Sequence, residues 1–273
     1  MMLWILGAEG LLGKALQKAC SGLGMAHVAT GREVDITRKE QLLSVIDQNG
    51  PTHLINCAAY TDVDGAEKEK ERAFAVNAEG PAHLGRLCFQ RGMRLIHLST
   101  DYVFDGKKGS PYTEEDLCAP VNVYGQSKHE GEKALLQELP TGCIVRTSWL
   151  FGEGGKNFLS KLQELLQNRE RLEIDALQMN RPTEVSELVR VLWFLLNREG
   201  IWHVASRGVT TRFEVASYLL EELRKRGTGV KCAISPVTSV EAKGAPRPFY
   251  SALSTEKIEA LTPLAHWKEV VCE

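Results

Sequence analysis

Hydrophobic and polar positions in the first half of the chain alternate between two patterns. Short apolar runs are separated by longer stretches whose apolar residues recur at helical spacing. This alternation is typical of strand–helix–strand units, which build a parallel sheet covered by helices on both faces. The apolar runs predict strands at residues 3–6, 27–29, 53–57, 94–98 and 143–146. The stretches between and after them predict helices at residues 11–20, 37–47, 66–76, 81–90 and 124–139, and a capping box of Thr37 and Glu40 opens the second of these.

The pattern is less regular beyond residue 150. It predicts helices at residues 157–166, 184–196 and 213–226, and short strands at 172–174, 201–204 and 231–234. Thr183 and Thr211 are suited to be N-caps, and Glu214 completes a capping box with Thr211. We therefore expect an α/β fold with a Rossmann-type, doubly wound parallel sheet in residues 1–150. Residues 151–273 are expected to form mainly a smaller substrate-binding lobe, with some segments returning to the first domain.

Composition and charge exclude several classes of protein. The 273 residues are 25% charged and 43% hydrophobic, with a net charge of −2, so nothing in the bulk charge favours nucleic acid or membrane binding. Seven scattered cysteines without a Cys-x-x-Cys pair favour reduced thiols and a cytoplasmic location. The apolar N-terminus is too short for a signal peptide, and Arg190 interrupts the longest apolar stretch.

A glycine-rich turn follows the first predicted strand. Gly7, Gly10 and Gly13 lie where the chain passes from that strand into a helix that begins at Leu11 and Leu12. In dinucleotide-binding folds such glycines permit a tight turn, close approach of a pyrophosphate, and close packing of helix on strand. The helix N-terminus adds free N–H groups for the phosphates. The spacing differs from the usual GxGxxG, and a purely structural turn is the alternative.

The end of the second predicted strand bears on the choice of cofactor. NAD-binding folds usually place an acidic residue there for the ribose 2′-hydroxyl, whereas this chain has Arg32. A guanidinium can bind a 2′-phosphate through two hydrogen bonds, which favours NADPH. Glu33 follows directly, so a loop ion pair and NADH remain alternatives.

Three residues carry the candidate chemistry. Tyr124 and Lys128 are four residues apart, on one face of a predicted helix, and Thr100 lies 24 residues before Tyr124. A free phenol has a pKa of about 10. We expect the Lys128 ammonium to lower the pKa of Tyr124 toward the range useful for proton transfer. The sequence thus predicts a nicotinamide-dependent oxidoreductase acting on a carbonyl, with an exposed tyrosine and a solvated lysine as the alternative.

Longer strings of residues connect the chain to a known family. They are NCAAYTDVDGAE at 56–67, STDYVFDG at 99–106, PVNVYGQSK at 120–128, RTSWLFG at 146–152, GKNF at 155–158, RPT at 181–183 and RPxxSxL at 247–253. From residue 2 to about residue 267 the chain resembles the dTDP-4-dehydrorhamnose reductase family of the extended short-chain dehydrogenase/reductase superfamily.

The resemblance implies a reaction. NADPH would reduce the 4-keto group of dTDP-4-dehydro-L-rhamnose to give dTDP-L-rhamnose. Tyr124 would protonate the developing alkoxide, Thr100 would donate a hydrogen bond to the same oxygen, and Lys128 would bind the nicotinamide ribose. Further cofactor-binding residues implied by the resemblance are Asp35, Ile36, Ala58, Ala59, Tyr60 and Asn77. Substrate-binding residues implied by it are Thr61, Val63, Thr100, Asp101, Tyr102, Trp149, Asn157 and Arg247.

The chain also departs from the pattern of that family. Ala176 and Leu177 replace an acidic pair, and Asn180 replaces a glycine, so the sugar that is reduced stays open. The metal question is open too: some relatives use a divalent ion such as Mg²⁺, and Glu9 lies within the glycine turn. A homodimer is common among relatives.

Two other functions remain as alternatives. A reductase or epimerase of another nucleotide sugar would share Tyr124 and Lys128. A non-catalytic regulatory subunit, such as that of methionine adenosyltransferase, resembles the same family.

Overall fold

A six-stranded parallel sheet forms the centre of the fold in this computed structural model, which describes residues 1–155, 157–239 and 244–272. Residue 156, within one of the strings that carry the family resemblance, lies outside the described residues. The strand order is β10-β5-β4-β3-β1-β2, and every pair is parallel. The strands are β1 (Leu3–Leu6), β2 (His27–Thr30), β3 (His53–Asn56), β4 (Arg94–Thr100), β5 (Cys143–Thr147) and β10 (Gly200–His203).

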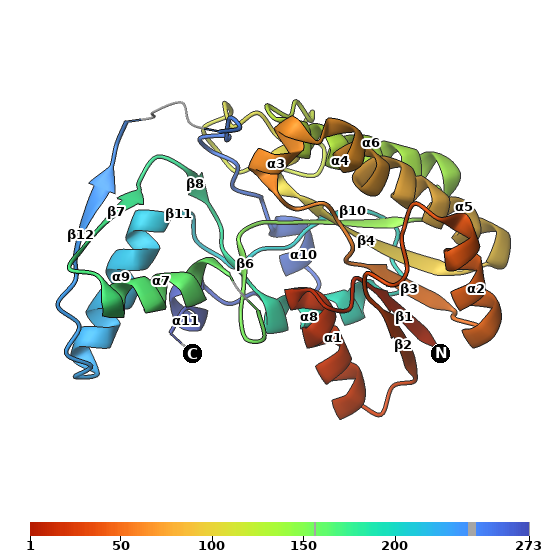
Figure 1. The fold of residues 1–273 in the computed structure, drawn as a ribbon, viewed down its shortest axis with the longest axis horizontal. Helices are drawn as coiled ribbons and strands as arrows, with labels where there is room; N and C mark the ends of the chain where they lie inside the picture. Colours follow the sequence, from red (N-terminus) through yellow and green to blue (C-terminus); the bar gives the residue numbers. More distant parts are fainter. Residues whose placement is uncertain (156, 240–243, 273) are drawn as a thin grey trace.

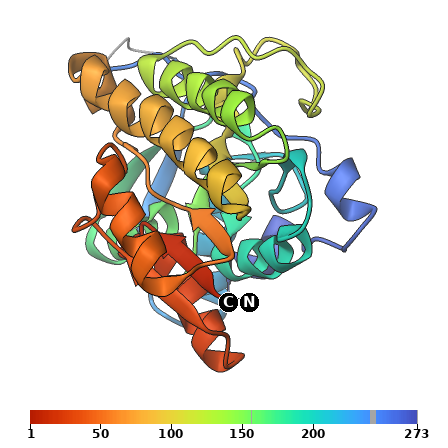
Figure 2. The same cartoon turned by 90° about the vertical axis from the view of Figure 1, so that its right-hand side faces the viewer.

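Helices cover both faces of this sheet (Figure 1), which explains why its strands are continuous apolar runs. Leu3 and Ile5 pack toward α1 (Leu11–Gly22) and α8 (Val185–Leu195). Trp4 and Leu6 point to the opposite face, where α2 (Lys39–Asn49), α5 (Gly80–Arg91) and α6 (Val123–Glu138) lie. Figure 2 shows α5 and α6 side by side. The predicted fold class is confirmed.

The helical region before α5 is more broken than predicted. Instead of one helix over residues 66–76, the chain forms α3 (Val63–Lys68), α4 (Lys70–Phe74) and a π-helical turn, η1 (Ala75–Glu79). The break falls at Glu69, whose φ of −112° and ψ of 47° are not helical. Single π-helical turns are frequent at functional sites. A short 3₁₀ turn, η2 (Asp101–Val103), follows β4.

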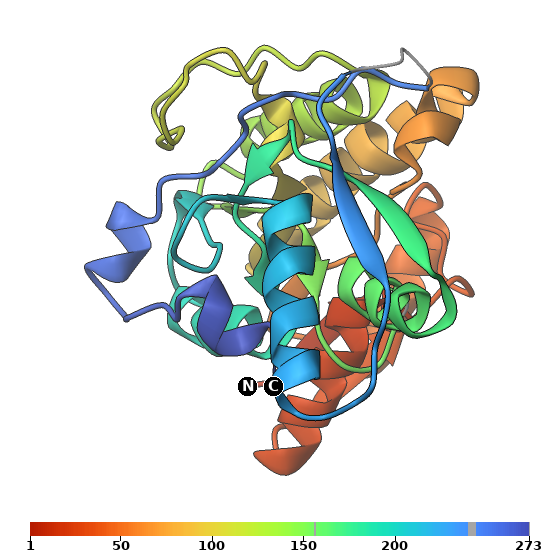
Figure 3. The ribbon, with the colours of Figure 1, turned by 90° about the vertical axis from the view of Figure 1, so that its left-hand side faces the viewer.

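A second group of elements surrounds its own hydrophobic cluster, which includes Phe151, Leu162, Leu219 and Trp267. Figure 3 shows β7 and β12 running beside each other next to α9. The elements in this part of the chain are β6 (Leu150–Phe151), α7 (Phe158–Asn168), β7 (Arg171–Asp175), β8 (Met179–Asn180), β9 (Thr183–Glu184), β11 (Thr210–Thr211), α9 (Arg212–Lys225), β12 (Ala233–Val237), α10 (Glu256–Glu259) and α11 (Trp267–Val270).

Segments from the second half of the chain also pack on the large sheet, among them α10 through Ile258. Strand β10 extends the sheet beyond β5, with Ile201 opposite Ile144. Helix α8 shares a hydrophobic cluster with β1 and α1. We predicted that the remaining residues after 150 form a separate substrate-binding lobe, and this stays a prediction. No helix among the described residues is long and apolar enough to cross a membrane.

Two of the predicted helix caps are wrong. The N-cap of α2 is Arg38, one residue after the predicted Thr37, and the Thr37 hydroxyl donates instead to Asp35, 2.8 Å away. Helix α8 is capped by Glu184 and not by Thr183: the Glu184 carboxylate accepts from the Glu187 N–H at 2.7 Å, while the Thr183 hydroxyl accepts from the Thr147 hydroxyl. In both places the N-cap is the residue directly after the predicted threonine.

The capping box at the start of α9 is confirmed and gives a test. The Thr211 hydroxyl accepts a hydrogen bond from the Glu214 backbone N–H, and the Glu214 carboxylate accepts one from the Thr211 N–H. Replacing Thr211 by alanine should lower the free energy of unfolding by about 1 kcal/mol. Thr37→Ala is the matched control and should cost clearly less, since Thr37 caps no helix. Denaturant titration of both variants checks this, and equal losses would contradict it.

Candidate active site

The glycine turn lies at the carboxyl ends of β1 and β3, between the two strands where the order of the sheet reverses. Doubly wound sheets bind ligands at this position. Gly7 has a φ of +88°, and a Cβ there would lie 2.7 Å from the Ala58 backbone nitrogen. A Cβ at Gly13 would lie 2.3 Å from the Gly7 carbonyl oxygen. Gly10 caps α1 without a side-chain hydrogen bond, which leaves the first N–H groups of the helix for a phosphate.

Arg32 stands exposed at the end of β2. Its side chain is 97% accessible, and its Nε lies 4.0 Å from the exposed Glu9 carboxylate, a separation at which an exposed pair holds the guanidinium only weakly. Asp35 accepts hydrogen bonds from the Thr37 N–H and hydroxyl, which lowers its pKa. Ile36 is 4% exposed and packs in the core, so its backbone is the part that an adenine could contact.

Asn77 joins the loop after β3 to helix α6. Its amide oxygen accepts from the Tyr60 N–H at 2.8 Å. Its amide nitrogen donates to the Tyr60 carbonyl and to the Ser127 hydroxyl, each at 3.0 Å. The predicted backbone wall of Ala58, Ala59 and Tyr60 is thereby fixed relative to the helix that carries Tyr124.

The three predicted catalytic residues meet at the carboxyl end of β4. Thr100 is the last residue of that strand, and Tyr124 and Lys128 lie on the first two turns of α6. Thr100 is 6% exposed and Lys128 2% exposed. The Tyr102 ring stacks edge-on against Tyr124, with ring centroids 5.9 Å apart. The structure therefore brings a hydroxyl, a phenol and an amine to one buried edge of the sheet.

The expected effect of Lys128 on Tyr124 is wrong for this structure. Burial is the main influence on Tyr124 and raises the pKa of its phenol, while a hydrogen bond with Thr100 opposes the shift. Lys128 donates instead to the Leu98 carbonyl at 2.7 Å and lies 3.3 Å from His97 Nε2. Tyr124 thus stays protonated at neutral pH, which suits a proton donor.

Beneath Lys128 lies a polar pair that the sequence analysis missed. The Asn56 amide oxygen accepts from the Ala58 N–H at 3.0 Å, so its amide nitrogen faces His97 Nδ1 at 2.9 Å. His97 is fully buried, and burial together with the charge of Lys128 holds its pKa well below the ordinary value. The available signal was the presence of Asn56 and His97 inside two apolar strand runs.

A buried ion pair lies one helical turn beyond Lys128. Glu132 accepts from Arg146 Nε at 2.9 Å and from Nη2 at 2.6 Å, and also from the Ser99 hydroxyl. Both charged side chains are 3% exposed. Burial opposes ionisation of Glu132, but the hydrogen bonds and charge of Arg146 prevail and lower its pKa to about 2. Helix α6 is thereby tied to β4 and β5.

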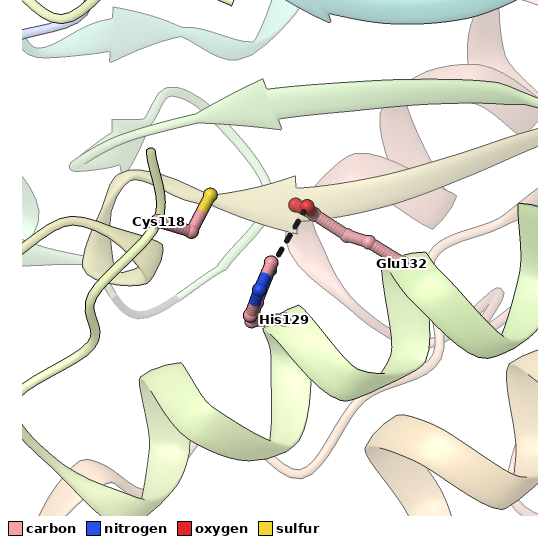
Figure 4. A group of neighbouring side chains, drawn as sticks. All are labelled: Cys118, His129 and Glu132. Atoms are coloured by element: carbon pink, nitrogen blue, oxygen red, sulfur yellow. Dashed lines mark ion pairs between the residues drawn. The ribbon is translucent and has the colours of Figure 1, made fainter. Parts of the chain in front are cut away.

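Within the described ranges, one cluster has side chains of the metal-ligating kinds: Cys118, His129 and Glu132, which converge on one space in Figure 4. A thiol and an imidazole suit zinc-like ions and do not suit Mg²⁺, which prefers oxygen ligands. Arg146 already donates to both Glu132 oxygens, and its Nη2 lies 3.2 Å from Cys118 Sγ. The guanidinium supplies the positive charge there, and we assign no metal to this cluster.

Several predicted substrate residues already have protein partners, and Asp101 accepts a hydrogen bond from the Thr100 hydroxyl at 3.1 Å. Its carboxylate is 3% exposed and accepts from Asn180 Nδ2 and Ser251 Oγ, each at 2.6 Å. Burial raises its pKa to about 6, and these hydrogen bonds oppose the rise. Asn180, a departure from the family pattern, thus braces the residue next to Thr100.

Asn157 and Arg247 are two further predicted substrate residues whose side chains have protein partners. Asn157 caps α7 in a capping box. Arg247 forms a two-pronged ion pair with Asp64, with N–O distances of 2.6 and 2.8 Å. Thr61 lies in the loop before α3 and Val63 is the first residue of that helix, while Trp149 lies two residues after the end of β5 and directly before β6.

The site combines a glycine turn, at the point where the strand order of a parallel sheet reverses, with a threonine, a tyrosine and a lysine. This combination defines a nucleotide-binding oxidoreductase of the extended short-chain dehydrogenase/reductase class. The family model described as the RmlD substrate binding domain matches residues 1–273, and the chain belongs to that family.

Known proteins are similar to this chain in sequence and in structure over nearly its whole length. The dTDP-4-dehydrorhamnose reductase of Mycobacterium tuberculosis is 40% identical over 279 residues, covering 98% of this chain and 90% of that protein. A dTDP-4-keto-6-deoxy-D-glucose reductase of Streptomyces niveus is 38% identical, covering 97% and 93%. The crystal structure of dTDP-4-dehydrorhamnose reductase from Bacillus anthracis in complex with NADP has a TM-score of 0.92 and 33% identity, covering 99% of this chain and 96% of that chain.

The Glu132–Arg146 pair should be essential to stability. Glu132→Gln leaves the Arg146 charge buried without its counter-ion and should lower the free energy of unfolding by roughly 3–5 kcal/mol. Glu138→Gln, on the same helix, removes the partner of the half-exposed Arg86 and should cost far less. Chemical denaturation at pH 7 compares the two variants. A Glu132→Gln protein as stable as Glu138→Gln would refute the importance of the pair.

Lys128 should reduce the stability of the protein without cofactor. Burial is the main cause that lowers the pKa of Lys128 from 10.5 to about 8, while Glu132 and Cys57 act in the opposite direction. Because the folded pKa lies below the unfolded one, the cost is complete below pH 8 and disappears as the pH rises to 10.5. Lys128→Met should therefore be more stable at pH 7 by roughly 1–3 kcal/mol.

The matched control for this test is Lys133→Met, since Lys133 lies on the same helix and is 59% exposed. Unfolding free energies are measured from pH 7 to pH 10.5 for both variants. Only the Lys128 variant should show a stability gain that shrinks with rising pH, and a constant or absent gain would count against the buried charge.

Proposed function

We propose that the chain is an NADPH-dependent reductase that converts the 4-keto group of dTDP-4-dehydro-L-rhamnose to the alcohol of dTDP-L-rhamnose. The observation that carries the proposal is the meeting of Thr100 and Tyr124 at the buried end of β4, beside Lys128. The names of the relatives and their near-complete coverage support the choice of substrate.

NADPH, when bound, supplies the hydride that reduces the sugar C4. Tyr124, held as a neutral phenol, donates its proton to the carbonyl oxygen as negative charge develops there. The Thr100 hydroxyl donates a second hydrogen bond to the same oxygen. The resulting phenolate takes up a proton from solvent, which restores the starting state. Lys128, which contacts Leu98 and His97 in this structure, would hold the nicotinamide ribose through a hydrogen bond from its ammonium group.

The cofactor site follows from the first two βα units. Gly7, Gly10, Leu11, Leu12 and Gly13 provide the turn and the helix N-terminus for the pyrophosphate. Arg32 is exposed and only loosely paired, which favours a cofactor with a 2′-phosphate, and the NADP complex of the Bacillus anthracis structure supports NADPH. Asp35, Ile36, Ala58, Ala59, Tyr60 and Asn77 line the remainder of the proposed site.

A different 4-keto nucleotide sugar is the second candidate substrate. Asn180 stands where the family pattern has glycine, and it binds Asp101 beside the proposed reaction centre. The Streptomyces niveus relative carries the name of a reductase for another dTDP-4-keto sugar. A homodimer and a cytoplasmic location remain part of the proposal.

Replacing Tyr124 by phenylalanine tests the proposed proton donor. The variant should bind NADPH as tightly as the unsubstituted protein, because the ring and the fold are kept, while kcat falls roughly 10²- to 10⁴-fold. Tyr218→Phe is the control and should keep full activity, because Tyr218 packs edge-on against Trp267 in the second hydrophobic cluster. NADPH consumption and NADPH titration give the two quantities.

An unchanged kcat in Tyr124→Phe would show that another group is the acid. Steady NADPH consumption with a second dTDP-4-keto sugar, and none with dTDP-4-dehydro-L-rhamnose, would move the assignment to the second substrate. NADPH binding without turnover on either sugar would favour the regulatory-subunit alternative.

A further inference from the structure

Trp149 has an unusual backbone at the edge of the candidate site. It is the one non-glycine residue with a positive φ, +41°, among residues 1–155, 157–239 and 244–272. Such a conformation costs energy and persists where the surrounding structure holds it, often at binding sites. Trp149 lies two residues after Thr147, which pairs with Thr100 across β5 and β4.

Arg212, which the sequence analysis did not single out, stacks on this tryptophan. It is the first residue of α9. The centre of its guanidinium lies 5.0 Å from the Trp149 ring and 5.6 Å from the Phe158 ring. A guanidinium placed over two aromatic rings is held in one orientation by cation–π attraction.

The two stacked groups each present a donor without an acceptor. Trp149 Nε1 and Arg212 Nε are both buried, and neither has a hydrogen-bond partner. Buried N–H groups in folded proteins are nearly always paired, so two orphans on one stacked pair indicate an acceptor supplied by a ligand. Arg212 also differs from Arg247, whose charge is balanced by Asp64, because no carboxylate in the described part of the chain pairs with Arg212.

The pair lies near the proposed proton donor. Burial and the charge of Asp101 raise the pKa of Tyr102 to about 12, whereas the charges of Arg212 and Arg247 act in the opposite direction. Both guanidinium groups are therefore close enough to Tyr102 for their charges to be felt there. Tyr102 in turn stacks on Tyr124. The Arg212 guanidinium thus places a positive charge near the reaction centre, and no acidic side chain in the described residues pairs with it.

We propose that Arg212, held on the ring of the predicted substrate residue Trp149, binds an oxygen of the substrate's diphosphate together with the Trp149 N–H, an inference that rests on the proposed function. A guanidinium presents a planar fork that matches phosphate oxygens, and the indole N–H adds a neutral donor. The anion is not the cofactor's own. The cofactor pyrophosphate belongs at the turn after β1, and a 2′-phosphate at Arg32 after β2, whereas Trp149 follows β5, three strand positions away from β1 in the sheet.

Arg212→Gln in the full chain tests this directly. The affinity for dTDP, measured by calorimetry, should fall roughly 10- to 100-fold, the usual loss for hydrogen bonds to a charged group. KM for the sugar nucleotide should rise far more than kcat falls. The Kd of NADPH should stay within about twofold, since Arg212 is assigned no cofactor contact. Arg207→Gln removes an exposed arginine from the preceding loop and should leave dTDP affinity unchanged.

Trp149→Phe tests the contribution of the indole N–H separately from that of the aromatic stacking. The phenyl ring keeps an aromatic surface under Arg212 but donates no hydrogen bond, so dTDP affinity should fall severalfold. In the double variant the loss should be smaller than the product of the two single losses, because both donors serve one diphosphate.

Three outcomes would overturn the inference. The first is unchanged dTDP affinity in Arg212→Gln while the unsubstituted protein turns over its substrate, which leaves the proposed function standing. The second is reduced unfolding stability with dTDP affinity intact, which would make the stack structural. The third is an unsubstituted protein that neither binds dTDP nor consumes NADPH, which removes the inference and the proposed function together.

Discussion

The ion pair between Glu132 and Arg146 is the constraint on which the arrangement of the site depends. It joins the middle of α6 to β5, and the Ser99 hydroxyl adds β4 to the same carboxylate. Lys128 lies one turn before Glu132 and Tyr124 one turn before that, so the pair sets the height and rotation of the helix against the end of β4. The cost of burying the two charges is offset by bidentate geometry and by the third hydrogen bond.

The candidate catalytic groups are polar residues inserted into an otherwise apolar sheet. Lys128 rests on the Leu98 carbonyl and against His97, and Asn56 holds that histidine from behind. Burial makes the amine easier to deprotonate and the Tyr124 phenol harder to ionise. A phenol that keeps its proton at neutral pH is suited to a reductive step, in which a carbonyl oxygen gains charge and must be protonated. Burying the Lys128 charge works against the stability of the fold, a conflict that is common at sites that prepare a reaction.

Much of this could be predicted from the sequence, because the relevant signals are local. Apolar runs located the strands, glycine spacing located the turn, and a four-residue spacing placed Tyr124 and Lys128 on one helix face. Properties that depend on contacts between distant segments could not be predicted. The direction of the Tyr124 pKa shift follows from burial, and Arg212 reaches Trp149 only after the chain has folded. Choices between adjacent capping residues were also beyond the pattern, since they depend on where the preceding strand or loop ends.

The most direct test of the central claim is isotope transfer. NADPH carrying deuterium at C4 of the nicotinamide is incubated with the protein and dTDP-4-dehydro-L-rhamnose, and the sugar product is analysed by mass spectrometry and NMR. Hydride transfer at the site of Thr100, Tyr124 and Lys128 predicts dTDP-L-rhamnose with deuterium on the sugar C4. A protein that binds NADPH yet yields no deuterated product would contradict the claim.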